Sequence, residues 1–93
     1  MEYLKSFDLT LDDINDILRS IDDQDKLEFD YNEDKIKKII KYFISKKITN
    51  IKDLIINRTY IFYEDYNKLK SVIDKLSKEQ IDLINRDASN LIV

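Results

Sequence analysis

Glycine and proline are both absent from this 93-residue chain, and that absence constrains its fold more than any other feature. Turns whose backbone needs a positive φ must be made by Asn, Asp or Lys, at some steric cost. The two-residue turns of tight β-hairpins favour glycine, so sheets built from such hairpins are disfavoured. The composition therefore predicts an all-α fold before any periodicity is considered.

Residue types that carry most enzyme chemistry are also missing. Without histidine or cysteine there is no imidazole base, thiolate or disulfide, and without glycine there is no phosphate loop of the usual kinds. Neighbouring acids, such as Asp12 with Asp13, lie where they stabilise a helix start or face solvent. We therefore expect no enzyme activity and no cofactor.

A calcium site fails on its spacing. Asp30, Asn32 and Asp34 match the first three ligand positions of an EF-hand loop. The sixth position is then Lys35 instead of glycine, and the twelfth is Lys41 instead of glutamate. We expect no metal site.

Location and origin follow from simpler patterns. No apolar run approaches the roughly 18 residues of a membrane span, and the first residues lack the apolar stretch of a secretory signal. We expect a cytoplasmic protein, in the producing or host cell, with no membrane partner. Ile, Lys, Asn and Tyr, which have AT-rich codons, fill the chain, so its gene comes from an AT-rich source such as a low-GC bacterium, a phage, a plasmid or a large DNA virus.

Apolar periodicity predicts four to five helices in a single domain, residues 1–93. Capping boxes at Thr10–Asp13 and Ser77–Gln80 open helices over residues 11–20 and 78–86. A helix over 33–47 presents a stripe of Ile36, Ile39, Ile40, Phe43 and Ile44. Asn50 with Asp53 is expected to cap a third, short helix that bears Ile51, Leu54 and Ile55. The helix over 65–76 turns Leu69, Val72, Ile73 and Leu76 inward.

Two segments are expected not to be helical. In the acidic stretch 22–34, Leu27, Phe29 and Tyr31 alternate with charges, which favours a short extended piece. Residues 59–62 are β-branched and aromatic and are expected to form a loop or strand. Of the aromatic residues from 60 to 66, most are expected in the core, with Tyr63 and Tyr66 the most exposed.

An internal repeat is the strongest pattern. Segments 13–19, 50–58 and 80–86 resemble one another, each combining an acid or amide, paired isoleucines or leucines, and a final arginine. At a spacing of 33, Phe29, Ile36, Ile39 and Phe43 match Phe62, Leu69, Val72 and Leu76. A long helix, a short helix and a linker recurring about every 30 residues predict two to three stacked helical-hairpin units.

This pattern resembles the helical repeats of the mitochondrial transcription termination factor family. The resemblance covers about residues 9–93 as two and a half units, although the proline and glycine common in the family's units are absent here. It implies a curved α-solenoid, which in that family binds nucleic acid.

A winged helix-turn-helix is the alternative. Residues 35–46 would be its second helix, 48–49 its turn and 50–58 its recognition helix, with 59–63 and 26–31 pairing as a small hairpin. Only Lys52, Asn57 and Arg58 would then face bases, which is few for a recognition helix.

Charge is distributed very unevenly. Residues 1–34 hold twelve acids and three bases, a net charge of −9, whereas residues 35–58 hold eight bases and one acid, a net charge of +7. The basic segment is a candidate for phosphate contact through Lys37, Lys38, Lys41, Lys46, Lys47, Lys52 and Arg58. The acidic segment is a candidate for presenting a nucleic-acid-like surface to a basic protein, or the two segments neutralise each other.

The sequence thus predicts a non-enzymatic protein-binding module, as an inhibitor or accessory factor of phage or plasmid origin. Its candidate protein contacts are Asp22, Asp23, Asp25, Tyr63 and Tyr66. The alternative is nucleic-acid binding through the lysine-rich segment 35–52. The apolar tail Leu91–Val93 either docks on the last helix or mediates a homodimer.

Overall fold

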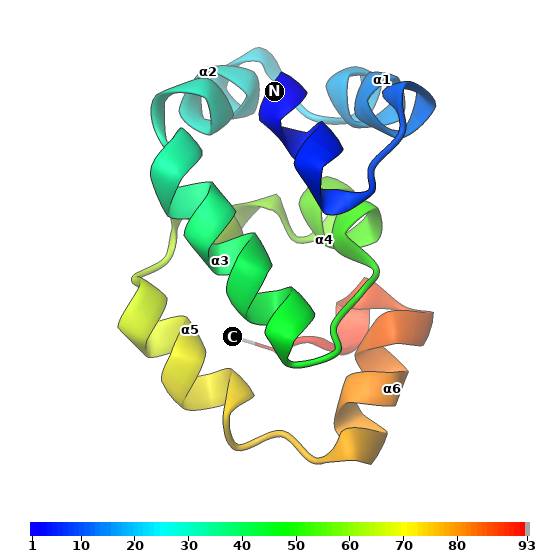
Figure 1. Ribbon diagram of the computed structural model, residues 1–93, viewed down its shortest axis with the longest axis vertical. Coiled ribbons are helices and arrows are strands. Elements are labelled where there is room, and N and C mark those ends of the chain that lie inside the picture. The colour runs from blue at the N-terminus through cyan, green and yellow to red at the C-terminus, as the bar shows by residue number, and fades with distance from the viewer. Residues whose placement is uncertain (93) are drawn as a thin grey trace.

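The computed structural model describes residues 1–92 and contains no strand among them. Its helices confirm the all-α prediction but exceed the predicted four or five (Figure 1). They are η1 (Glu2–Phe7), α1 (Leu11–Ser20), α2 (Asp23–Tyr31), α3 (Glu33–Ser45), α4 (Ile51–Asn57), η2 (Thr59–Tyr63), α5 (Tyr66–Ile73), α6 (Lys78–Arg86) and η3 (Ala88–Asn90), where η marks a 3-10 helix.

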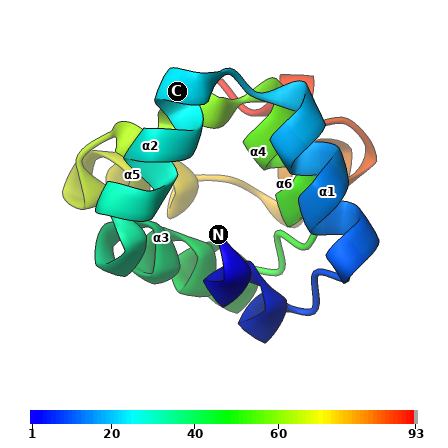
Figure 2. The ribbon, with the colours of Figure 1, turned by 90° about the horizontal axis from the view of Figure 1, so that it is seen from above.

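The helices form two groups on opposite sides of the molecule. One group holds α1, α4 and α6, and the other holds α2, α3 and α5, in both the front view and the view from above (Figures 1 and 2). Helix α1 packs on α4, while α3 packs on both α2 and α5. The three similar segments 13–19, 50–58 and 80–86 therefore all contribute to the first group.

Capping explains where the predicted helices begin. The Thr10 hydroxyl accepts from the Asp13 amide, and the Asp13 carboxylate accepts from the Thr10 amide. Ser77 and Gln80 form the same reciprocal pair. Each box satisfies two amides at a helix start, and both predicted capping boxes are confirmed.

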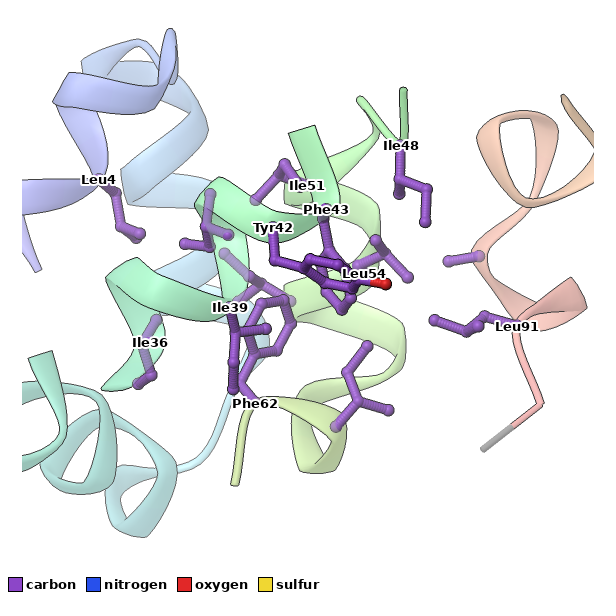
Figure 3. Close-up of a cluster of buried hydrophobic side chains, with 14 of the residues drawn as sticks. Leu4, Ile36, Ile39, Tyr42, Phe43, Ile48, Ile51, Leu54, Phe62 and Leu91 are labelled. Atoms are coloured by element: carbon purple, nitrogen blue, oxygen red, sulfur yellow. The ribbon is translucent and has the colours of Figure 1, made fainter. Parts of the chain in front are cut away.

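A single cluster of buried apolar side chains lies between the two groups (Figure 3). Phe29, Phe43 and Phe62 have no exposed surface, and the Phe62 ring centroid lies 5.8 Å from each of the other two. The stripe predicted on α3 is buried except for Ile44, which is 40% exposed. The core thus joins residues far apart in the chain around Phe62.

Turns with positive φ occur at Asp8 (φ 64°) and Lys47 (φ 68°). Residue types with a Cβ carry a steric cost in this conformation. Both positions confirm that a chain without glycine makes such turns with Asp or Lys.

The extended segment predicted over 27–31 was wrong, because these residues form α2. The Asp22 side chain accepts from the Asp25 amide at 2.8 Å and starts this helix. No strand in residues 1–92 is available as a pairing partner, so the backbone groups are satisfied within a helix. The three apolar residues do not share one side of this helix, because Phe29 faces the core whereas Leu27 and Tyr31 face solvent.

The hairpin of the winged alternative is not formed, since both of its segments are helical, in α2 and η2. In η2 the buried residues are Ile61 and Phe62. The expected exposure of the tyrosines was also wrong: Tyr63 and Tyr66 are half-buried, whereas Tyr60 is 45% exposed.

Only part of the C-terminal tail is docked. Leu91 is docked and 1% exposed, whereas Ile92 is 83% exposed, and Val93 lies outside the described residues. No helix in residues 1–92 combines the length and apolar character needed to cross a membrane.

Candidate protein-binding face

Three of the predicted phosphate-contacting lysines are paired with acids of the same chain. Lys37 Nζ lies 2.9 Å from Glu33, and Lys46 Nζ lies 2.9 Å from Asp74. Lys52 reaches across from α4 to α1, where its Nζ lies 2.7 Å from Asp16 and 3.2 Å from Asp13. The expected mutual neutralisation of the acidic and basic segments is thus present at Lys52.

The α1–α4 ion pairs also shift protonation equilibria. The hydrogen bond from Lys52 lowers the pKa of Asp16, and hydrogen bonds to Asp16 and Asp13 raise the pKa of Lys52. Lys52 therefore holds two helices together and is not available to a phosphate without breaking that contact.

The remaining basic candidates differ in their surroundings. Arg58 Nη2 donates to the Ser89 carbonyl at 2.8 Å, and Lys38 Nζ lies 4.2 Å from the centre of the Tyr66 ring. Lys41 and Lys47 are exposed and form no ion pair with any carboxylate in residues 1–92. Lys38, Lys41, Lys47 and Arg58 are thus the candidates that form no ion pair in residues 1–92.

Among the acidic candidates, two stabilise the fold. Asp22 caps α2, and Asp25 accepts a hydrogen bond from the Tyr63 hydroxyl at 2.8 Å. The Tyr63 ring packs edge-on against Phe29 with centroids 6.0 Å apart, and burial together with Asp25 raises the pKa of Tyr63. Asp23 alone projects fully, with 98% of its side chain exposed and an ion pair to Lys26 at 3.2 Å.

Tyr66 is likewise part of an internal contact. Its ring meets Tyr42 edge-on with centroids 5.7 Å apart, while Lys38 covers it. The Tyr42 hydroxyl donates to Asp74, which Lys46 and Lys70 also bind at 2.9 Å. These contacts join α3 to α5, so Tyr66 is not freely available to a partner.

A different apolar surface emerges on α2. Its exposed residues all lie on one side of the helix, opposite buried Phe29, and we call them the α2 outer face: Asp23, Gln24, Leu27, Asp30 and Tyr31. Leu27 is 53% exposed, and Tyr31, four residues later and therefore beside it, is 88% exposed. Sequence reasoning missed this face because it expected an extended segment, in which Leu27, Phe29 and Tyr31 share one side.

The surroundings of this face are strongly acidic. Residues 22–34 hold seven acids and one lysine, a net charge of −6. That lysine, Lys26, is already paired with Asp23. An apolar pair inside an acidic field is suited to a protein surface that combines basic side chains with an apolar contact.

Comparison with known proteins finds no match to any family model, curated protein sequence or solved structure.

Proposed function

We propose that this chain is a non-enzymatic protein-binding module whose α2 outer face binds a basic protein surface. The exposure of Leu27 and Tyr31 on an acidic helix carries the proposal. Exposed aromatic residues are the usual anchors of protein interfaces, and surrounding charges set the partner's sign and the association rate. By covering a basic surface, such a module acts as an inhibitor or accessory factor.

A stacked array of helical units is the architecture that we propose for this module. The similar segments 13–19, 50–58 and 80–86 contribute to α1, α4 and α6, which share one side of the molecule. The repeat-related residues Phe29 and Phe62 pack together with ring centroids 5.8 Å apart. In such arrays each unit contacts its neighbours, and exposed faces are free for partners. The resemblance to the mitochondrial transcription termination factor repeats stays a prediction.

Affinity capture from the producing cell tests the function with three immobilised proteins. These are the wild type, the variant Leu27→Ser/Tyr31→Ser, and the control Leu11→Ser, which removes a leucine that is 60% exposed on α1. We expect basic proteins to be retained by the wild type and the control, and lost by the double variant. Equal retention by all three proteins would contradict the α2 outer face as the binding site.

Charge reversal at Asp22 or Asp25 is not a suitable test, because both side chains stabilise α2 or its contact with η2. Asp23 and Gln24 are exposed and are better positions. The variant Asp23→Lys/Gln24→Lys is expected to weaken capture while the far-UV circular dichroism stays that of the wild type.

Nucleic-acid binding is the second candidate function, favoured by three of the candidate lysines, Lys38, Lys41 and Lys47, which form no ion pair within residues 1–92. Fluorescence anisotropy of labelled duplex and single-stranded DNA tests it at about 50 and 200 mM salt. Binding that weakens steeply with salt and is lost in Lys38→Glu/Lys41→Glu supports it. The control Lys75→Glu/Lys78→Glu carries the same charge change on exposed positions elsewhere.

A further inference from the structure

A second surface complements the α2 outer face. On α3, Lys38, Lys41 and Ile44 are exposed and lie on adjoining positions of one side, and we call them the α3 outer face. Ile44 supplies an apolar contact that is 40% exposed, and the lysines supply positive charge. This combination is the kind of basic, partly apolar surface that the proposed function assigns to a partner.

The charges of the two regions match in size and differ in sign. Residues 22–34 have a net charge of −6, and residues 35–47, with six lysines and no acid, have a net charge of +6. Within residues 1–92, no ion pair joins α2 to the lysines of α3: Lys37 pairs with Glu33 and Lys46 with Asp74. Part of the acidic charge is compensated, since Asp23 pairs with Lys26 and Asp30 lies 3.0 Å from the N-terminal ammonium group. Lys38 and Lys41 form no ion pair with a carboxylate in residues 1–92, and Asp23 and Asp30 are exposed.

We infer that the α3 outer face docks the α2 outer face of a second copy of this chain. The inference rests on the proposed function, because it names a partner for the same α2 surface. In a twofold dimer each copy supplies both faces, so that the contact occurs twice. Leu27 and Tyr31 meet Ile44, while Asp23 and Asp30 meet Lys38 and Lys41.

Sedimentation equilibrium of the purified full chain over a range of concentrations tests this. At low salt the apparent mass is expected to rise from one chain of 11.2 kDa toward two, and high salt is expected to weaken the association because exposed charges are screened. Lys38→Glu/Lys41→Glu and Asp23→Lys/Gln24→Lys are each expected to lower the association constant by at least about tenfold, since like charges then face each other. The control Lys75→Glu/Lys78→Glu keeps the wild-type value.

Charge exchange gives the decisive comparison. A chain that carries both reversals restores opposite charges across the contact and is expected to associate again, as is an equimolar mixture of the two reversed variants. A wild type that stays at the mass of one chain at low salt overturns the inference. The inference is also overturned if Lys38→Glu/Lys41→Glu associates like the wild type, whether or not that variant has lost DNA binding.

The same variants separate this inference from the proposed function. Lys38→Glu/Lys41→Glu leaves the α2 outer face intact, so it still captures a basic partner if the proposed function holds. Loss of self-association with retained capture supports both statements. Capture that depends on Leu27 and Tyr31, from a chain that never self-associates, retains the function and overturns the dimer.

Discussion

Truncation of Phe62 to alanine is expected to remove much of the stability of the fold. The Phe62 side chain has no exposed surface and packs against Phe29 and Phe43, which belong to α2 and α3. Replacing a buried phenylalanine by alanine costs about 3–5 kcal/mol, because apolar burial is lost and a cavity remains. A chain of this length has a total stability of roughly 5–14 kcal/mol. With a urea m value of about 1.5 kcal/mol per M, the midpoint falls by about 2–3 M.

Urea unfolding followed by far-UV circular dichroism measures this loss. Tyr60→Ala is the matched control, since Tyr60 lies two residues earlier in η2 and is 45% exposed, and it is expected to cost about 1 kcal/mol or less. Phe62→Leu keeps most of the volume and gives a foldable intermediate case, at about 1 kcal/mol. A cost for Phe62→Ala no larger than that of Tyr60→Ala would refute the placement of Phe62 at the centre of the core.

Three further predictions concern local features and use the same urea assay. Lys47→Gly is expected to raise stability by about 0.5–1 kcal/mol because it relieves the steric cost of a positive φ. Lys46→Gly, at φ −95°, is expected to lower stability. A change of the same sign in both variants would contradict the positive φ at Lys47. Ser77→Ala is expected to lower stability by about 0.5–2 kcal/mol through loss of the capping box. Ser71→Ala, at an exposed position of α5, is expected to leave stability nearly unchanged. Equal effects of the two substitutions would argue against the cap. Hydrogen bonds from Tyr42, Lys46 and Lys70 lower the pKa of Asp74 below its usual value. The contribution of the Asp74 carboxylate to the free energy of unfolding is therefore fully present above the unfolded pKa of about 3.9 and is lost as the pH falls below that value. The stability difference between wild type and Asp74→Asn is expected to shrink from pH 6 to pH 2, and a difference that stays constant would refute these hydrogen bonds.

Local sequence signals were sufficient for several elements. The capping boxes at Thr10 and Ser77 are confirmed, because their hydrogen bonds join residues only three positions apart. The apolar stripe of α3 is confirmed except at Ile44, because its period of 3.6 residues is a property of the helix itself. The missing glycine likewise indicated that Asp or Lys would occupy positive-φ turns.

The candidate surfaces were less predictable. Asp25 and Tyr63 were chosen as partner contacts, yet they bond to each other across 38 positions. The exposed pair Leu27 and Tyr31 was overlooked, because the side that it occupies depends on whether α2 is a helix or a strand. A spacing of four residues places two side chains together only after the helix is known.

The sequence by itself determined that the chain is helical, where several helices start, and that its first third is acidic and its middle basic. Those properties depend on backbone freedom, capping and charge counts, which are local or additive. Only the tertiary structure decided which side chains remain available to a partner. It pairs Lys52 with Asp13 and Asp16 and covers the Tyr66 ring with Lys38. It leaves Leu27, Tyr31 and Lys41 facing solvent. Pairing between residues distant in the chain depends on how whole helices pack, and no local pattern encodes that packing.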